Sequence, residues 1–410
     1  MRSSRLAGAV LLLLAGCDEP GPSEWDWPPE PRCELLETRS PQLGELEPSA
    51  EFRIACGKHA PIGAPSIVVS ADATWVLADG STAIAEAWRL YRIADGEFDV
   101  VTWRENASTS LAVLASSDDG DAWLFASRGY SRALELARLD ASSAALELEL
   151  LGSNGWIERV EIAGSTPQLW FSNERHELMR ATIDAHGEWV EMPALAVEGV
   201  DVWKPRVGLD GAGRQIAYAA KSTPDYAIEI WAHDGHTTKL LGSFADLSWA
   251  PAEPIPTAHP GDVDHEHAAY VERESGVTVL WPDSGDTVSV PWSPSFADPS
   301  CLVTSRVVSA RTSDGRMWLA WVVYGLPSCN VPGTEAPTLR LIEIDPTQRS
   351  AGERMRLELD HAHLGFSQRW SPSLDVRIAI TSHADQLALV IPDGPADQRL
   401  HVVQVDVHPD

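Results

Sequence analysis

Residues 108–153 read STSLAVLASSDDGDAWLFASRGYSRALELARLDASSAALELELLGS and contain four strand-like segments separated by turns. The apolar segment 111–115 is followed by a cluster of Ser, Asp and Gly, which favours a turn, and then by the apolar segment 122–126. Segments 134–139 and 146–150 alternate apolar with polar residues, so each can bury one face. The stretch therefore predicts a four-stranded antiparallel unit.

The same unit returns along almost the whole chain, and an aromatic residue in its second strand marks each copy. The aromatic residues are Trp75, Trp123, Trp170, Tyr218, Tyr270 and Trp318, with steps of 48, 47, 48, 52 and 48 residues. A seventh copy without an aromatic residue fits when it is aligned on Leu387, 69 residues beyond Trp318. Such a period is typical of propellers, in which each sheet buries its faces against its neighbours. We predict an all-β fold, a seven-bladed β-propeller of four-stranded antiparallel blades.

Strand counting indicates how the ring closes. The last copy offers three strands, at 374–380, 386–391 and 400–407, where the other copies have four. Residues 52–56 are strand-like and precede the first complete copy. This N-terminal strand is expected to complete the last blade, because closure removes the exposed sheet edges that favour aggregation.

The first 49 residues have the composition of a leader and a tether. A short cationic stretch and the apolar run 6–14 precede Cys17, and the run is too short for a mature membrane span. Residues 14–17, Leu-Ala-Gly-Cys, resemble the bacterial lipobox, in which the cysteine is acylated; the alternative is an ordinary secretory signal. The expected organisation is a signal peptide over 1–16, a Pro- and Glu-rich tether over 17–49 starting at acylated Cys17, and the propeller over 50–410.

The resemblance implies attachment to a membrane of the cell envelope through the lipid, with the inner and outer membranes both left open. Acyl chains on one cysteine are sufficient for stable anchoring when there are two or more of them. With 60 acidic and 31 basic residues the net charge is -29, which argues against nucleic acid as a partner.

Four cysteines besides Cys17 fit an oxidising compartment and allow three pairings: Cys33, Cys56, Cys301 and Cys329. In an up-and-down blade, the loop before the first strand and the loop between the second and third strands lie at the same end. This topology favours a bridge between Cys301 and Cys329, which leaves Cys33 for Cys56. Free thiols are the alternative, and the spacing does not fit a zinc site.

Residues 116–123 fit the Asp-box, Ser-x-Asp-x-Gly-x-x-Trp, and 52–55, Phe-Arg-Ile-Ala, resemble the Phe-Arg-Ile-Pro segment of sialidases. The resemblance implies a sialidase-like or other glycan-cleaving propeller enzyme. The Asp-box match, however, falls between the first and second strands, whereas in sialidases it lies between the third and fourth. Arg159, Arg206 and Arg306 lie near inner strands, but no tyrosine has an evident partner. We assign no catalytic residue and keep the enzyme as the alternative function.

One acidic and imidazole-rich segment is a candidate metal site, with Asp262, Asp264, His265 and His267 as the ligands. The alternative is an ordinary solvated turn. No phosphate-binding loop or metalloprotease motif is found, so no cofactor is expected apart from such a divalent metal.

Five tryptophans near one end of the expected ring form the candidate binding set: Trp156, Trp203, Trp249, Trp292 and Trp370. Exposed indoles could stack on sugars or anchor a protein, but repeated tryptophans also fill the space between blades. The chain resembles propeller-type bacterial lipoproteins. We therefore expect a lipid-anchored binding or assembly module for a protein or glycan partner, with non-catalytic action favoured over enzymatic action.

Overall fold

The computed structural model describes 25 segments of the chain, and all of them consist of strand, turn or loop. They are residues 33–56, 65–81, 86–94, 97–102, 111–116, 120–128, 132–140, 149–163, 166–175, 177–183, 188–193, 206–209, 215–220, 227–233, 237–245, 253–254, 268–273, 275–282, 284–293, 302–312, 316–325, 337–359, 378–383, 385–393 and 399–407. Within these segments no helix is present that could cross a bilayer.

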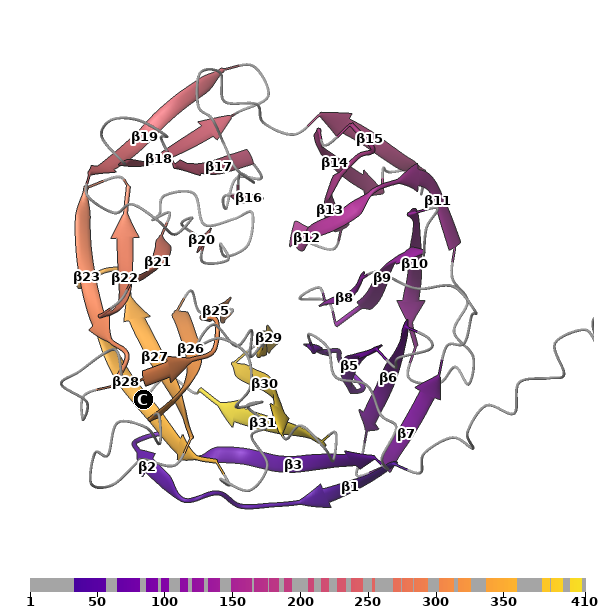
Figure 1. Cartoon of the computed structure of the whole chain (residues 1–410), viewed down its shortest axis with the longest axis vertical. Coiled ribbons are helices and arrows are strands. Elements are labelled where there is room, and N and C mark those ends of the chain that lie inside the picture. The colour runs from indigo at the N-terminus through magenta and orange to yellow at the C-terminus, as the bar shows by residue number, and fades with distance from the viewer. Residues whose placement is uncertain are drawn as a thin grey trace, which may run out of the picture.

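The described strands assemble into seven antiparallel sheets arranged around a ring (Figure 1), so the fold is a β-propeller. Blade 1 contains β4 (Ser66–Val69), β5 (Thr74–Ser81), β6 (Glu86–Ala94) and β7 (Glu97–Thr102). Blade 2 contains β8 (Leu111–Ser116), β9 (Ala122–Arg128), β10 (Ala133–Leu139) and β11 (Glu149–Asn154). Blade 3 contains β12 (Trp156–Ala163), β13 (Thr166–Ser172), β14 (Leu178–Ile183) and β15 (Trp189–Pro193).

The second half of the ring continues the pattern. Blade 4 contains β16 (Arg206–Leu209), β17 (Gln215–Ala220), β18 (Ala227–His233) and β19 (Thr238–Ala245). Blade 5 contains β20 (Glu253–Pro254), β21 (Ala269–Arg273), β22 (Gly276–Trp281) and β23 (Asp286–Pro291). Blade 6 contains β24 (Leu302–Thr304), β25 (Val308–Arg311), β26 (Met317–Gly325), β27 (Thr338–Asp345) and β28 (Ser350–Glu358). Blade 7 contains β29 (Ala379–His383), β30 (Gln386–Asp393) and β31 (Arg399–Asp406).

The N-terminal part of the chain closes the ring as the strand count predicts. Strand β3 (Pro48–Cys56) pairs antiparallel with β31 and supplies the missing fourth strand of blade 7. The pairing joins residues more than three hundred positions apart, with Phe52 opposite Val402. The predicted N-terminal closure is therefore confirmed.

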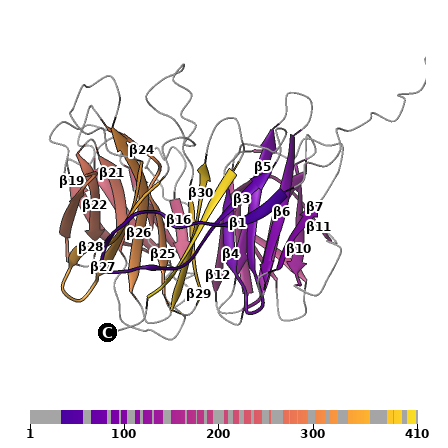
Figure 2. The ribbon, with the colours of Figure 1, turned by 90° about the horizontal axis from the view of Figure 1, so that it is seen from below.

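The expected tether is wrong over its second half, because residues 33–49 belong largely to the sheets. Strand β1 (Cys33–Glu37) pairs with β3, and β2 (Gln42–Gly44) pairs with β28. Strand β1 is the fifth strand of the blade 7 sheet and β2 the sixth strand of the blade 6 sheet, and both lie along the outside of the ring in Figure 1 and Figure 2. The prolines that suggested a tether do not prevent this, since a strand on a sheet edge needs partners on one side only.

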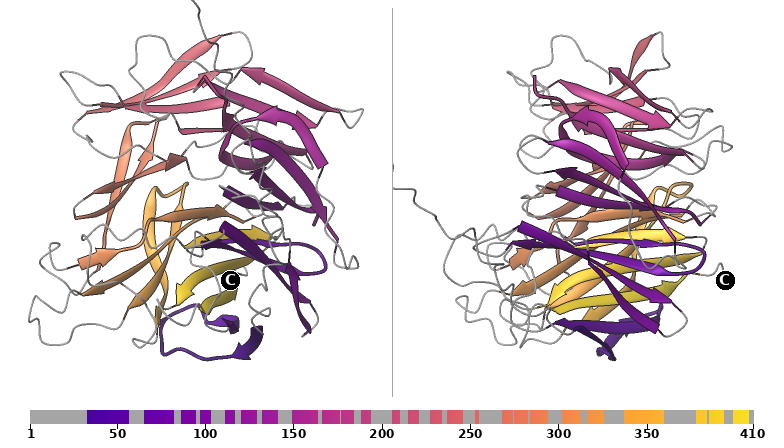
Figure 3. Two further views of the ribbon diagram at one scale, coloured as in Figure 1. Left: turned by 45° about the vertical axis from the view of Figure 1, so that its right-hand side comes forward. Right: turned by 90° about the vertical axis from the view of Figure 1, so that its right-hand side faces the viewer.

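The core lies between neighbouring blades, because the middle strands bury both faces. In β26, Trp318 and Val322 pack against blade 7, whereas Leu319 and Trp321 pack toward blade 5. Side chains alternate along a strand, so a sheet buried on both faces requires an apolar run without polar alternation. The sheets accordingly stack around the ring, as the two views of Figure 3 show.

The aromatic residues of the repeat face the next blade in chain order. Trp75 packs toward blade 2, Trp123 toward blade 3 and Trp318 toward blade 7. Leu387 instead packs against blade 6, while Ala388 faces blade 1. The seventh copy was therefore aligned one residue out of phase, and a shift of one residue reverses the face of every side chain in a strand.

Two other expected strands are described only in part. The fourth strand of blade 2, expected at 146–150, is described at Glu149–Asn154, and the first strand of blade 7, expected at 374–380, is described at Ala379–His383. Residues 146–148 and 374–377 lie outside the described segments, and both strands continue beyond the expected ends through their antiparallel pairing.

Candidate functional site

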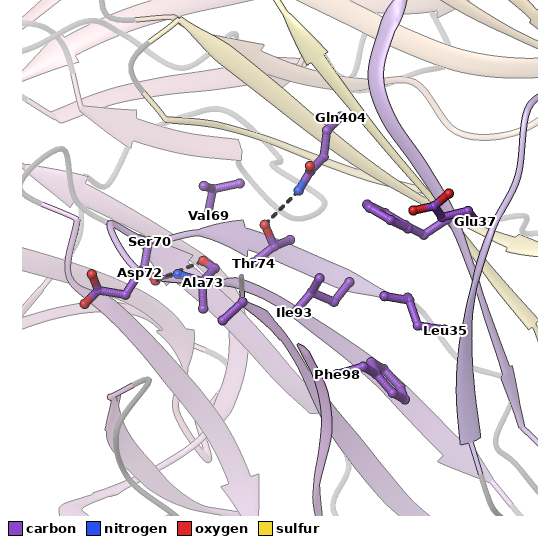
Figure 4. Close-up of a pocket in the computed structure, with 12 residues that line it drawn as sticks. Leu35, Glu37, Val69, Ser70, Asp72, Ala73, Thr74, Ile93, Phe98 and Gln404 are labelled. Carbon is purple, nitrogen blue, oxygen red and sulfur yellow. Dashed lines mark hydrogen bonds between the residues drawn. The ribbon is translucent and has the colours of Figure 1, made fainter. Parts of the chain in front are cut away.

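A cavity of about 520 Å³ lies where blade 7 meets blade 1 (Figure 4). One side is formed by β1, β3 and β31, and the other by β5, β6, β7 and the turn between β4 and β5. The volume falls within the range of small-molecule pockets in proteins. We call this cavity the seam pocket, because it lies at the junction that the N-terminal strands close.

The apolar wall of the seam pocket contains two phenylalanines, one from each of the two blades that meet there. Phe52 comes from β3 and Phe98 from β7, with Leu35 of β1 and Ile93 of β6 beside them. Phe98 stacks on buried Tyr91, with ring centroids 5.9 Å apart and an interplanar angle of 15°. This stacking holds one face of Phe98 in place, so its ring is a preorganised part of the wall.

Polar groups line the rest of the seam pocket. The Gln404 amide donates from Nε2 to Thr74 Oγ1 at 2.9 Å, which links blade 7 to blade 1. This bond leaves the Thr74 hydroxyl proton and the Gln404 side-chain oxygen without a partner among the described residues. Figure 4 shows these two residues between Asp72 at one end and Glu37 at the other.

The two carboxylates of the seam pocket are exposed. Neither Glu37 nor Asp72 has an ion pair or a side-chain hydrogen bond within the described segments, although both line the cavity. Of the described residues that line the pocket, none is Lys, Arg or His. The pocket therefore offers hydroxyl, amide and carboxylate oxygens next to aromatic rings.

A buried acid–imidazole pair holds the seam behind the pocket. His401 Nε2 of β31 lies 2.6 Å from Glu51 Oε1 of β3, and both side chains are almost fully buried. Ser40 adds hydrogen bonds to the same carboxylate from its backbone N–H, at 2.8 Å, and from its hydroxyl. Burial by itself raises the pKa of Glu51, but the bonds from His401 and Ser40 outweigh burial and hold that pKa below its ordinary value of 4.5.

Two of the five predicted tryptophans lie within the described residues, and the other three lie outside them. Trp292 is buried, meets Trp321 edge to face at 5.8 Å and donates from Nε1 to the Arg273 carbonyl at 2.8 Å. Trp156 begins β12, and the Arg132 guanidinium lies over its ring, 3.4 Å from the centroid. Trp292 therefore packs between blades, as the alternative interpretation expects. Trp203, Trp249 and Trp370 lie outside the described residues.

The sequence candidates for a metal site and for lipidation fall outside the described segments. The proposed metal ligands Asp262, Asp264, His265 and His267 lie outside them, as does Cys17. Among the residues that are described, no group of three or more His, Cys, Asp or Glu side chains could hold a metal.

The sialidase-like features show no converging arrangement in the described structure. The Asp-box match runs from the end of β8 to the start of β9, the first and second strands of blade 2, as the sequence indicates. Arg159 lies in β12 and Arg206 in β16, on different blades, and Arg306 is exposed between β24 and β25. The three arginines therefore lie near inner strands, as the sequence indicates. Their positions do not define a catalytic site.

Only one of the two favoured cysteine pairs lies within the described residues. Cys33 and Cys56 are Cα partners across β1 and β3. Cys301 and Cys329 lie outside the described residues, but the strands beside them place Leu302 opposite Gly325. The chain segments that carry these two cysteines therefore leave blade 6 at the same end.

Sequence reasoning missed the seam pocket. Its residues come from β1, β31 and the strands of blade 1, and no local pattern links Glu37, Thr74 and Gln404. The one available signal was the predicted closing strand, since it required residues near 52 to lie beside the last blade.

No protein-family model matches the chain, and no curated protein matches its sequence. Several solved structures are similar to it. The BP39L lectin of Burkholderia pseudomallei is 12% identical, with a TM-score of 0.47 over 86% of this chain and 98% of the lectin. Aleuria aurantia lectin, described as a six-bladed β-propeller, is 11% identical, with a TM-score of 0.42 over 75% and 96%. Trypanosoma rangeli sialidase is 10% identical, with a TM-score of 0.40 over 92% and 60%. These likenesses concern the propeller fold alone.

Proposed function

We propose that this chain is a non-catalytic, glycan-binding propeller that a lipid on Cys17 anchors to a membrane of the cell envelope. The seam pocket is the binding site in this proposal. The anchor rests on the lipobox-like sequence at residues 14–17 and on the leader before it.

The observation that carries the proposal is the combination of rings and oxygens in one cavity. A pyranose ring has a C–H face that packs on an aromatic ring and hydroxyls that require hydrogen-bond partners around its rim. Phe52 and Phe98 supply the apolar surface, and Thr74, Gln404 and the two carboxylates supply partners. A protein site built in this way binds a ligand that is apolar on one face and polar on its edge.

The proposed anchor and the pocket are close in the chain. Residues 17–32 would connect the acylated cysteine to β1, and β1 supplies Leu35 and Glu37 to the pocket wall. The pocket would therefore remain within a short reach of the membrane, where envelope glycans are located.

The test is binding of a glycan panel by the full chain in detergent, with Phe98→Leu as the diagnostic variant. Leucine keeps an apolar side chain against Tyr91 but removes the flat ring, so glycan affinity should fall about tenfold, or ~1.4 kcal/mol. Val100→Ala is the matched control, because Val100 lies in the same strand and is 38% exposed outside the pocket. Its affinity should be unchanged.

Three results would contradict the proposal. These are no binding by any glycan, equal binding by the Phe98→Leu variant, and release of sugar from the bound glycan. The last result would favour the glycan-cleaving alternative.

A further inference from the structure

The charge of the seam pocket narrows the ligand class. Glu37 and Asp72 line the cavity, and no cationic side chain lines it within the described residues. The chain as a whole carries a net charge of -29, which has the same sign as these two carboxylates. The pocket is therefore a site of negative potential.

This potential has different consequences for acidic and basic sugars. A sugar carboxylate would meet two uncompensated acids without an arginine to bind it, so binding of sialic or uronic acids is disfavoured. An ammonium group gains a charge-assisted hydrogen bond, which is shorter and stronger than a neutral one. Both carboxylates are exposed, so salt screens their attraction for a cation.

The positions of the polar groups favour a sugar over a basic peptide. Figure 4 shows Glu37 and Asp72 at opposite ends, with Thr74 and Gln404 between them. A lysine side chain could meet a carboxylate but would leave the hydroxyl and amide in the middle unpaired. An amino-sugar chain presents cationic groups and hydroxyls along one ligand, so it can meet all of these groups.

We infer that the seam pocket selects glycans that carry unacetylated amino sugars and rejects acidic ones. This inference rests on the proposed glycan binding and adds to it the charge of the ligand. Glu37 and Asp72 are its specificity-determining residues, whereas Phe52 and Phe98 would contact any sugar.

The experiment compares three short oligosaccharides by calorimetry on the full chain in detergent: oligomers of glucosamine, of N-acetylglucosamine and of galacturonic acid. Oligolysine is the fourth probe. The glucosamine oligomer should bind about tenfold more tightly than its acetylated form, the factor that ~1.4 kcal/mol gives. Added salt should reduce this preference, and the galacturonate oligomer should not bind.

The Glu37→Gln, Asp72→Asn double variant should lose the preference for the glucosamine oligomer and keep the affinity for the acetylated one. Glu34→Gln is the matched control, because Glu34 is exposed on the same strand as Glu37 and does not line the pocket. This control should keep the preference.

The outcomes separate the two proposals. Equal affinity for both oligomers, or a preference that survives the double variant, overturns the amino-sugar inference and leaves glycan binding intact. Tighter binding of oligolysine than of any sugar also overturns the inference. Absence of binding by all the sugars overturns the proposed function itself.

Discussion

The Gln404 side chain donates a hydrogen bond to Thr74 Oγ1 at 2.9 Å, although the two residues are 330 positions apart. Gln404 belongs to the last strand of the chain and Thr74 to the second strand of blade 1. The bond therefore joins the two blades at which the ring begins and ends. Both residues also line the seam pocket, so ring closure and the proposed binding site share them.

The Thr74→Val change tests this link. Valine has nearly the same shape but no acceptor, so the Gln404 amide would lose its bond at a partly buried site, at a cost of about 1–3 kcal/mol. Urea unfolding of the variant measures the loss. The control is Thr287→Val, an exposed position on β23, for which no comparable loss is expected. Equal stability of the two variants would argue against a role for the bond.

The hydrogen bond between Glu51 and His401 predicts that the protein loses folding stability in acid. The pKa of Glu51 is lower in the folded state than its ordinary value of 4.5, so the folded protein binds fewer protons to this group than the unfolded chain does. The stability from Glu51 is therefore present above pH 4.5 and is lost as pH falls through the folded pKa.

The Glu51→Gln variant should be less stable than the wild type at neutral pH and should lose less stability on acidification. The neutral amide of Gln accepts the hydrogen bonds from His401 and Ser40 less strongly than a carboxylate does, and a hydrogen bond to a charged group contributes about 1.5–3 kcal/mol. Thermal melts at several pH values measure both effects. Parallel pH curves for the two proteins would mean that Glu51 does not contribute to the acid response.

Stepwise N-terminal deletions should separate the contributions of the outer strands. Deletion of residues 18–32 should leave the melting temperature unchanged, because β1 begins at Cys33. Deletion through Cys56 removes β3, exposes the edge of β31 and should cost several kcal/mol, comparable to the stability of a typical domain. A Cys33→Ser, Cys56→Ser variant controls for a lost disulfide. If this control melts with the longer deletion, the closing strand is not the cause.

A disulfide between Cys33 and Cys56 is expected from their direct pairing across β1 and β3. Direct opposition of Cα atoms in an antiparallel pair gives a separation within the range that disulfides require. Peptide mapping under non-reducing conditions should find these two cysteines together and Cys301 joined to Cys329. Recovery of Cys33 linked to Cys301 or Cys329 would overturn both pairings.

Lipid attachment is tested by the Cys17→Ser variant. Without the thiol no acyl chain can be attached, so the variant should move from the membrane fraction to the soluble fraction after carbonate washing. The wild type should remain in the membrane fraction. A Cys33→Ser variant controls for a general effect of losing a cysteine. Retention of the Cys17→Ser protein in washed membranes would contradict the lipoprotein proposal.

The fold could be predicted from the sequence because its information is local and repeated. The residue period, the aromatic position from Trp75 to Trp318 and the apolar runs all report on single strands and hairpins. Even the closing strand could be inferred, because a blade with three strands requires a fourth. Each of these inferences depends on hydrogen bonding and burial that every copy must satisfy in the same way.

The tertiary structure decided the face of the seventh copy, the outer strands β1 and β2, and the seam pocket. Leu387 and Ala388 are both apolar and adjacent, so only their neighbours show which of them faces blade 1. Strands β1 and β2 lie in a Pro- and Glu-rich segment that acquires strand structure from the edges of blades 7 and 6. The pocket brings Glu37, Thr74 and Gln404 together only when the ring closes, because long-range pairing between chain ends sets positions that no local pattern encodes.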